Sequence, residues 1–279
     1  MILLILAAGM GSRYGGMKQV DGFGPNGETI MDYALYDAIR TGFQKVVFVI
    51  QREMEGFMRE RFATHLTGKI AYTFAYQRVS TGRQKPWGTA HAVLCAASEL
   101  DAPFAVINAD DFYGLPAFET MANFLATSTL ESEFAMIGYQ LKNTLSQHGS
   151  VARGICVANE KGYLTEIVER TKIFSKGNEI VCEEKGKELP LSPDSLVSMN
   201  FWGLKSPFIE YGEPLFWQFS KDNADKPKAE FFIPLVIDYL MKVYAIKVKV
   251  LSNTSTWFGV TYAEDKAWVQ SALQQKIEA

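Results

Sequence analysis

Residues 2–19 read ILLILAAGMGSRYGGMKQ, an unbroken apolar run that leads into a loop of small and charged residues. A short apolar run of this kind is typical of a strand that is buried on both faces of a sheet. A signal peptide is not expected, because the run is short, has no positive segment before it and enters a glycine-rich polar loop at once. The chain is therefore predicted to begin with a buried strand and a glycine-rich loop.

The composition is that of a globular protein. The chain has 279 residues, of which 48% are hydrophobic and 21% charged, which excludes general disorder and allows a sizeable core. The net charge is −3 and no basic stripe is present, so nucleic acid and anionic membranes are not expected as partners. The sequence contains no run of roughly 20 apolar residues, so no membrane-spanning helix is expected. Cys95, Cys156 and Cys182 are far apart in the sequence, which suits a reducing, cytoplasmic setting.

Apolar runs alternate with helical spacing through the first half of the chain. Further strands are predicted at Lys45–Ile50, Lys69–Ala75, Phe104–Asn108 and Glu133–Leu141, and helices at Thr29–Arg40, Met54–Leu66, Thr89–Leu100 and Leu115–Leu125. This order predicts an α/β, Rossmann-like fold with a mostly parallel sheet and helices on both faces. Ligands bind beyond the carboxyl ends of the strands in such sheets, so the loops at 7–18, 77–88 and 109–114 are expected to form the site.

The second half has a different character. Strands are predicted at Gly149–Asn159, Tyr163–Glu169, Leu196–Leu204 and Tyr244–Leu251, and helices at Pro207–Ser220, Pro234–Val243 and Tyr262–Lys276. Thr171–Pro193 is polar and rich in Lys and Glu, which indicates an excursion at the surface. No repeat or flexible linker is found, so we expect one domain over residues 1–279, in which 142–279 form a ligand-facing second lobe.

The first loop has the composition of a phosphate-binding loop. Glycines let backbone N–H groups approach an anion closely, and Arg13 and Lys18 add two cations for a polyphosphate. A plain glycine-rich turn with solvated cations remains an alternative for such a loop alone. A dinucleotide fingerprint starting at Gly9 is excluded because Tyr14 stands where the third glycine is needed. A P-loop is excluded because its lysine is followed by Ser or Thr, whereas Gln19 follows Lys18.

The loop resembles the N-terminal signature of the sugar-1-phosphate nucleotidyltransferases, the enzymes that make nucleotide sugars. The matching pattern is Leu6-Ala7-Ala8-Gly9-x-Gly11-x-Arg13 followed by Lys18. Relatives often have a longer loop before their lysine. The resemblance implies that Arg13 and Lys18 are catalytic and stabilise the β- and γ-phosphates of a triphosphate. The nucleotide-binding residues that it implies in this loop are Leu6, Ala8, Gly9 and Gly11.

A second loop resembles the nucleobase site of the same family. Residues 86–90, PWGTA, are similar to the Gly-Thr-Ala turn that packs against the base. A glutamine after the third strand is similar to the one that reads a pyrimidine. The nucleotide-binding residues implied here are Gln77, Gly88 and Thr89. The stretch from Gln77 to Gly88 is longer than usual in the family, so Gln84 remains an alternative to Gln77. His91 is interpreted as a packing or helix-surface residue.

Two aspartates follow the strand that ends at Asn108. Mg²⁺ takes one or two protein carboxylates together with substrate phosphates, so one well-placed aspartate can anchor it. An Asp-Asp pair after a strand is also common in ordinary turns. The resemblance implies that Asp110 is a catalytic magnesium ligand. Asp111 would support Asp110 without contacting the metal, or it would cap the next segment.

The second metal ligand departs from the family pattern. Many relatives have an aspartate in a Trp-x-Asp stretch near the C-terminus, and the corresponding position here is Gly259. Another branch has Asn or Asp two residues later, which is Thr261 in this chain. The resemblance therefore implies Thr261 as the second ligand. A backbone carbonyl, water, Asp265 or Glu230 remain alternatives.

Three stretches resemble the sugar-phosphate side of the family's site. Gly149 begins a strand where relatives place a glycine against the sugar. Glu169 would accept hydrogen bonds from sugar hydroxyls, and either Arg170 or Lys172 would hold the phosphate. Asn200 belongs to the strand that completes the pocket. Each feature alone is typical of strand packing or a surface ion pair, and the resemblance rests on their order over most of the chain.

The resemblance implies an enzyme that joins a nucleoside triphosphate to a sugar 1-phosphate and releases pyrophosphate, with Mg²⁺ as cofactor. The nucleotide would be UTP or dTTP, with CTP left open, and the sugar phosphate would be glucose 1-phosphate by default. Residues 1–141 would bind the nucleotide and 142–279 the sugar phosphate. No general base is expected, because the attacking phosphate is already an anion. The alternatives are a glycosyltransferase that uses a nucleotide sugar and a non-catalytic nucleotide or sugar-phosphate sensor, which Gly259 favours. A homo-oligomer is left open.

Overall fold

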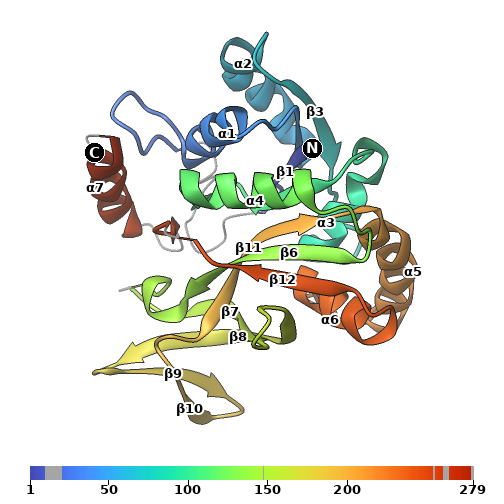
Figure 1. Ribbon diagram of the computed structural model, residues 1–279, viewed down its shortest axis with the longest axis vertical. Helices are drawn as coiled ribbons and strands as arrows, with labels where there is room; N and C mark the ends of the chain where they lie inside the picture. Colours follow the sequence, from blue (N-terminus) through green and yellow to red (C-terminus); the bar gives the residue numbers. More distant parts are fainter. Residues whose placement is uncertain (10–20, 147, 254, 260–263, 278–279) are drawn as a thin grey trace.

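The computed structural model describes residues 1–9, 21–146, 148–253, 255–259 and 264–277 (Figure 1). The helices are α1 (Ile30–Arg40), α2 (Glu55–Leu66), α3 (Thr89–Cys95), α4 (Leu115–Thr127), α5 (Ser206–Asp222), α6 (Ile233–Val243) and α7 (Asp265–Ile277). The strands are β1 (Ile2–Leu6), β2 (Lys45–Ile50), β3 (Ala71–Tyr76), β4 (Phe104–Asn108), β5 (Asp111–Phe112), β6 (Glu133–Gln140), β7 (Val151–Ala158), β8 (Leu164–Lys176), β9 (Glu179–Glu184), β10 (Lys187–Leu191), β11 (Leu196–Leu204), β12 (Lys247–Leu251) and β13 (Phe258–Gly259). None of the helices within these ranges has the length and hydrophobicity of a membrane span.

Strands from both halves of the chain form one sheet. Its order is β10-β9-β8-β7-β11-β4-β1-β2-β3, with β6 paired to β11 and β12 paired to β6. The four strands β3, β2, β1 and β4 are parallel, as predicted. Most strands of the second half are arranged differently. β11 and β7 to β10 pair with their neighbours in antiparallel fashion. The predicted parallel arrangement therefore holds for the four strands β1 to β4 and for the β6–β12 pair, which is also parallel, and not for the rest of the sheet.

Short turns explain the antiparallel pairing of the consecutive strands β7 to β10. Parallel strands need a long crossover, whereas antiparallel strands can be joined by a tight turn. The turn between β7 and β8 closes through a hydrogen bond from Gly162 N to Asn159 O of 2.8 Å. Between β9 and β10, Lys185 and Gly186 both have positive φ, 49° and 75°, as a two-residue hairpin turn requires.

The polar stretch Thr171–Pro193 is an excursion, as predicted, but it is built from strands. It contains the end of β8 and the β9–β10 hairpin, which extends from the body of the molecule (Figure 1). Lysines on β8 pair with glutamates across the hairpin, as in Lys172–Glu183 at 2.8 Å and Lys176–Glu188 at 2.5 Å. These strands carry exposed charged side chains and have low hydrophobicity, so a search for apolar runs does not detect them.

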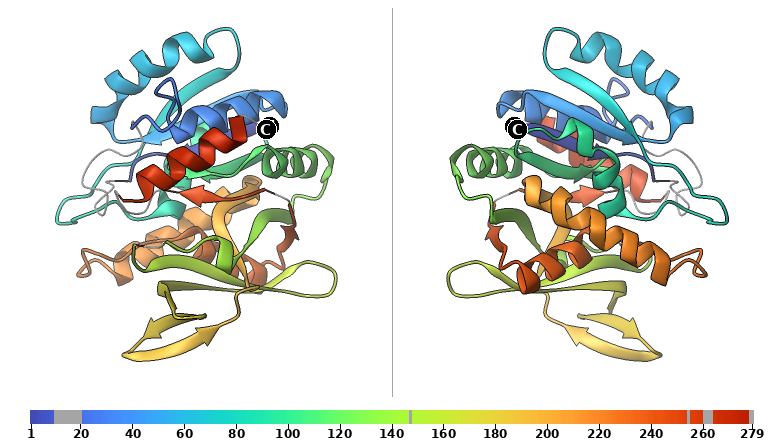
Figure 2. Two further views of the ribbon diagram at one scale, coloured as in Figure 1. Left: turned by 90° about the vertical axis from the view of Figure 1, so that its left-hand side faces the viewer. Right: turned by 90° about the vertical axis from the view of Figure 1, so that its right-hand side faces the viewer.

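Helices cover both faces of the sheet (Figure 2). On one face, Leu3 and Ile5 of β1 share a core with α1, α2 and α4. On the other, Ile2 and Leu4 share a core with α3, α5 and α6. Because successive side chains of a strand point to opposite faces, burial on both faces accounts for the unbroken apolar run that opens the chain.

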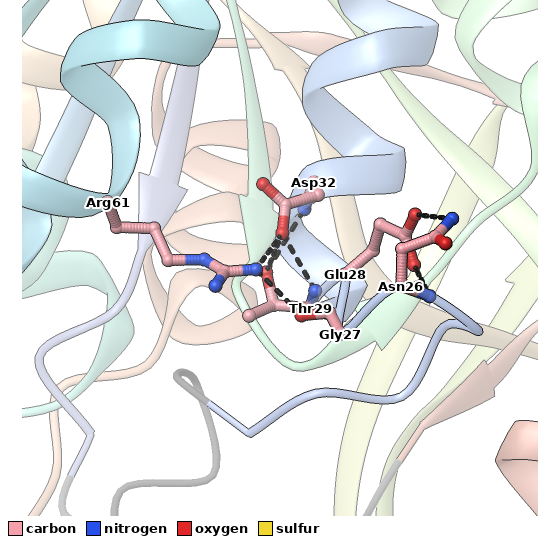
Figure 3. A network of polar contacts seen from close by, with 6 residues as sticks. All are labelled: Asn26, Gly27, Glu28, Thr29, Asp32 and Arg61. Carbon is pink, nitrogen blue, oxygen red and sulfur yellow. Dashed lines mark hydrogen bonds and ion pairs between the residues drawn. The ribbon is translucent and has the colours of Figure 1, made fainter.

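The start of α1 is fixed by a polar network (Figure 3). Thr29 and Asp32 form a capping box, in which each side chain accepts a hydrogen bond from the other residue's backbone N–H. Arg61 of α2 donates to Asp32 Oδ2 at 2.7 Å and to the carbonyl of Gly27 at 2.9 Å. The network therefore anchors the segment that leads into α1, which follows the first loop in sequence.

The C-terminal segment joins the first half of the chain through a short strand pair that the sequence did not predict. β13 pairs with β5 in antiparallel fashion, with Phe258 opposite Phe112 and Gly259 opposite Asp111. The two phenylalanine rings are stacked with centroids 4.4 Å apart. α7 packs on this pair through Val269. The pairing brings Gly259 to the residues that follow β4.

Candidate functional site

The ends of β1 and β4 lie beside the middle of β11 at the carboxyl edge of the parallel sheet. Leu6, the last residue of β1, lies beside Asn108, the last residue of β4. β11 has an irregular register between Ser198 and Trp202, and Asn200 within it has φ of +59°, a conformation that asparagine tolerates better than most residues. Asn200 Nδ2 is 3.4 Å from Asn108 Oδ1. The structure thus brings the predicted residues Leu6 and Asn200 to one place.

The start of the first loop is held by β2. Ala7 N donates to Val49 O at 2.8 Å, and Gln51 Nε2 donates to Ala8 O at 2.9 Å. Ala8 and Gly9 therefore lie at the carboxyl end of β1. Gln51 was not singled out from the sequence, although it follows a buried strand as the other site residues do. The remaining predicted residues of this loop, Gly11, Arg13 and Lys18, lie outside the described residues.

Asp111 is buried against β13. Its Oδ2 accepts a hydrogen bond from Asn108 Nδ2 at 2.9 Å, and its side chain is only 8% exposed. A Cβ on Gly259 would lie 2.3 Å from Asp111 Oδ1, closer than real Cβ atoms come. The space in which a side chain at position 259 would begin is therefore occupied by this carboxylate, which explains why glycine stands there.

Restoring an aspartate at position 259 is expected to destabilise the fold. In Gly259→Asp, the new Cβ collides with Asp111 Oδ1 and with the Trp257 ring, 2.8 Å away, and a second carboxylate is placed against a buried one. A loss of about 3 kcal/mol or more is expected in chemical denaturation. The double variant with Asp111→Gly removes the collision with Asp111 and the carboxylate repulsion but leaves the close approach to Trp257, so it should recover part of the loss. A Gly259→Asp protein as stable as the wild type would contradict this reading of the contact.

The donor set after β4 fits a hard cation. Asp110 is half-buried and provides carboxylate oxygens, which Mg²⁺ prefers, whereas Asp111 is bound to Asn108. Among the described residues, no three metal-ligating side chains lie together, so substrate phosphates and water would complete the shell. The other predicted ligand, Thr261, is outside the described ranges. Of the alternatives, Asp265 accepts a hydrogen bond from Ser146 Oγ at 3.1 Å, and Glu230 is paired with Lys85.

Two of the predicted nucleobase residues, Gln77 and Gly88, are in contact. Gln77, 4% exposed, follows β3, and its Nε2 donates to the carbonyl of Gly88 at 2.9 Å. The same nitrogen lies 3.1 Å from His91 Nδ1, a contact that the sequence did not indicate. His91 is packed, as predicted, with its ring stacked on Phe216 at 4.5 Å. Gln84, the alternative to Gln77, is exposed.

The Gly88–Thr89 turn is held by the segment before α6. Gly88 has φ of +102°, and a Cβ there would lie 2.8 Å from Phe231 O, so only glycine fits. Thr89 Oγ1 accepts a hydrogen bond from Ile233 N at 3.1 Å. Both residues are thus required for the packing of two segments that are distant in sequence, in addition to any role in binding.

The sugar-phosphate candidates are divided between two places. Gly149, Lys172 and Gly259 line an open cleft of about 1610 Å³. Glu169, Arg170 and Asn200 are not among its described lining residues. Arg170 forms an ion pair with Glu184 of β9. The cleft therefore brings only one of the two candidate cations to the glycine.

Burial raises the pKa of Glu169 to about 7, although Arg153 acts to lower it. The folded protein therefore favours the neutral acid. The contribution of the neutral Glu169 side chain to the stability of the folded state is fully present below the ordinary pKa of 4.5. That contribution is lost as the pH rises through 7. Glu169→Gln should consequently be more stable than the wild type at pH 9, by about 2 kcal/mol after solvent screening, and similar at pH 4. Urea denaturation at the two pH values measures this, and a difference independent of pH would contradict the buried, raised-pKa carboxyl.

Comparison with known proteins identifies similar sequences and folds. A sequence profile of the nucleotidyl transferase family matches residues 2–186. A UTP–glucose-1-phosphate uridylyltransferase of Haloferax volcanii is 25% identical over 178 residues, which are 60% of this chain and 64% of that relative, so the match spans less than two thirds of its length. The inositol-1-phosphate CTP transferase from T. maritima has a similar structure, with a TM-score of 0.66 at 12% identity over 98% of this chain and 96% of that one. A UDP-glucose pyrophosphorylase complexed with UDP-glucose gives 0.63 at 15% identity, over 99% and 98%. The structural likeness confirms the predicted fold.

Proposed function

Because the chain belongs to the nucleotidyl transferase family, we propose that it joins UTP or dTTP to a sugar 1-phosphate, with glucose 1-phosphate as the first candidate, and releases pyrophosphate. The observation that carries this is the pairing of Leu6 with Asn108, which sets the start of the glycine-rich loop beside the aspartates that follow β4. The Haloferax volcanii relative, named for UTP and glucose 1-phosphate, supports the choice of substrates.

In this proposal, an oxygen of the sugar phosphate attacks the α-phosphorus in line. A new oxygen–phosphorus bond forms as the bond to the β-phosphate breaks, and pyrophosphate leaves. The protein contributes positioning and charge neutralisation rather than covalent chemistry. Arg13 and Lys18 neutralise the β- and γ-phosphates as negative charge develops on the leaving group. The backbone of Leu6, Ala8, Gly9 and Gly11 holds the nucleotide from the other side.

Asp110 and Thr261 are the proposed magnesium ligands. Bound Mg²⁺ supplies charge neutralisation and orientation at the phosphates. Asp111 keeps its hydrogen bond to Asn108 and so holds the turn that presents Asp110. The position at 259 needs no second aspartate in this arrangement, because its space is filled.

For the sugar phosphate, Lys172 is proposed over Arg170 as the cation. Lys172 lines the same cleft as Gly149, and its ion pair with Glu183 joins two exposed side chains, so that pair contributes little and can be exchanged for a phosphate. Glu169 and Asn200 are not among the described residues that line this cleft, so the hydrogen bonds that we propose between them and the sugar hydroxyls require the sugar ring to extend beyond it. Gly149 lets the ring approach the backbone.

A pyrophosphate-release screen tests this function. UTP, dTTP, CTP, ATP and GTP are each combined with Mg²⁺ and a panel of sugar 1-phosphates. We expect release that depends on both substrates and is fastest with UTP or dTTP. Sugar transfer from a nucleotide sugar without pyrophosphate would favour the glycosyltransferase alternative. Tight binding of both ligands without turnover at saturating Mg²⁺ would favour the sensor.

A further inference from the structure

The side-chain amide of Gln77 has both of its hydrogens directed at fixed acceptors. An amide nitrogen carries two hydrogens. In Gln77 one points to the Gly88 carbonyl at 2.9 Å and the other to His91 Nδ1 at 3.1 Å. The backbone N of Gln77 also donates to Ile50 O at 3.0 Å, so the residue is held at the end of β3. The nitrogen side of the amide is therefore fully used within the protein.

The reverse orientation of the amide is unfavourable. It would place Oε1 against the Gly88 carbonyl, where two acceptors repel each other. The Gly88 carbonyl cannot turn away easily, because the Phe231 backbone lies close against Gly88. The hydrogen bond from Ala90 N to Phe231 O, at 2.9 Å, also ties the turn to that segment. Oε1 therefore points away from both contacts. Within the described part of the chain, no hydrogen bond reaches Oε1.

His91 is suited to the role of acceptor. Its ring is stacked on Phe216, with an angle of 27° between the planes, and its Nε2 lies 3.6 Å from Cys95 Sγ. Burial, with a smaller effect of the Arg83 guanidinium, lowers the pKa of His91 to about 4. The ring is thus neutral near pH 7, and with its proton on Nε2 it offers the Nδ1 lone pair to Gln77.

We propose that His91 is a positioning residue that fixes the amide of Gln77 with Oε1 toward the nucleobase, so that the site prefers a pyrimidine with an N–H on its pairing edge over one with a bare nitrogen there. Uracil and thymine carry N3–H at this position, whereas N3 of cytosine is an acceptor. A fixed Oε1 accepts from the first and repels the second. This inference rests on the proposed function and specifies which residue sets its choice of base.

The test compares UTP with CTP in three variants. His91→Phe keeps a stacking ring but removes the acceptor, so the Gln77 amide can rotate and present either side. The ratio of kcat/KM for UTP over CTP is expected to fall about tenfold, through KM for the nucleotide, with KM for the sugar phosphate unchanged. His91→Gln, which restores an acceptor, should recover part of the ratio. Cys95→Ala is the matched control, because it touches His91 and not Gln77.

A double-mutant cycle separates positioning from packing. If His91 acts through Gln77, the effect of His91→Phe on the ratio disappears in a Gln77→Met background. His91→Met serves as the second variant if His91→Phe lowers the thermal midpoint strongly. An unchanged UTP-to-CTP ratio in a folded His91 variant, or an equal loss for both nucleotides, would overturn the inference. Absence of pyrophosphate release with every substrate pair would instead count against the proposed function, and titration of UTP and CTP binding would then still test His91.

Discussion

Asp110→Asn is expected to lower kcat on the order of 10³-fold and leave the fold intact. The amide has the shape of the carboxylate but lacks its charge, so it is a poor ligand for Mg²⁺ and leaves the developing charge on the phosphates unbalanced. Asp110 is half-buried after β4, and an isosteric change there should alter the thermal midpoint little. Steady-state kinetics over a range of Mg²⁺ concentrations and Mn²⁺ binding followed by electron paramagnetic resonance measure the two effects separately.

Asp111→Asn is the matched control for this experiment. Asp111 is the neighbouring carboxylate, but it is 8% exposed and bound to Asn108. Its replacement is expected to affect stability more than Mn²⁺ affinity. Near-normal turnover of Asp110→Asn, or equal losses of Mn²⁺ affinity in both variants, would remove Asp110 from the role of metal ligand.

Lys18→Ala is expected to reduce kcat/KM for the triphosphate by about 10²-fold, because it removes one of the two cations proposed to stabilise the leaving pyrophosphate. KM for the sugar phosphate should stay unchanged, since Lys18 belongs to the nucleotide loop. Lys69→Ala is the control, because Lys69 is exposed and precedes the amino end of β3, at the opposite edge of the sheet. A change confined to the sugar-phosphate KM would contradict the assignment of Lys18.

The parallel half of the fold could be predicted from local sequence signals. Apolar runs such as Lys45–Ile50 and Phe104–Asn108 match β2 and β4 within the whole of their length, because a strand buried on both faces leaves a strong local pattern. The β5–β13 pair could not be predicted. Strands of two residues have no periodicity, and their pairing depends on contacts between Phe112 and Phe258, which are far apart in the chain.

Only the part of the candidate site that local sequence motifs mark could be predicted. The resemblance indicated both Gln77 and Gly88, and the structure places their side chain and carbonyl in contact. Gln51 was missed, and His91 was interpreted only as a packing residue, because no local pattern connects either residue to its partner. Gln51 contacts Ala8, 43 residues earlier, and His91 contacts Gln77, 14 residues earlier. Polar residues just after buried strands are the signal that would have identified Gln51.

Tracing the α-phosphorus of the nucleotide tests the proposed reaction most directly. With α-³²P-labelled UTP or dTTP, glucose 1-phosphate and Mg²⁺, the label is expected in a nucleotide sugar, while a γ-³²P label is expected in pyrophosphate, in equal amounts. Added labelled pyrophosphate should return to the triphosphate when the nucleotide sugar is supplied. An α label that stays in the triphosphate with every sugar 1-phosphate tried, under conditions where both ligands bind, would contradict nucleotidyl transfer by this chain.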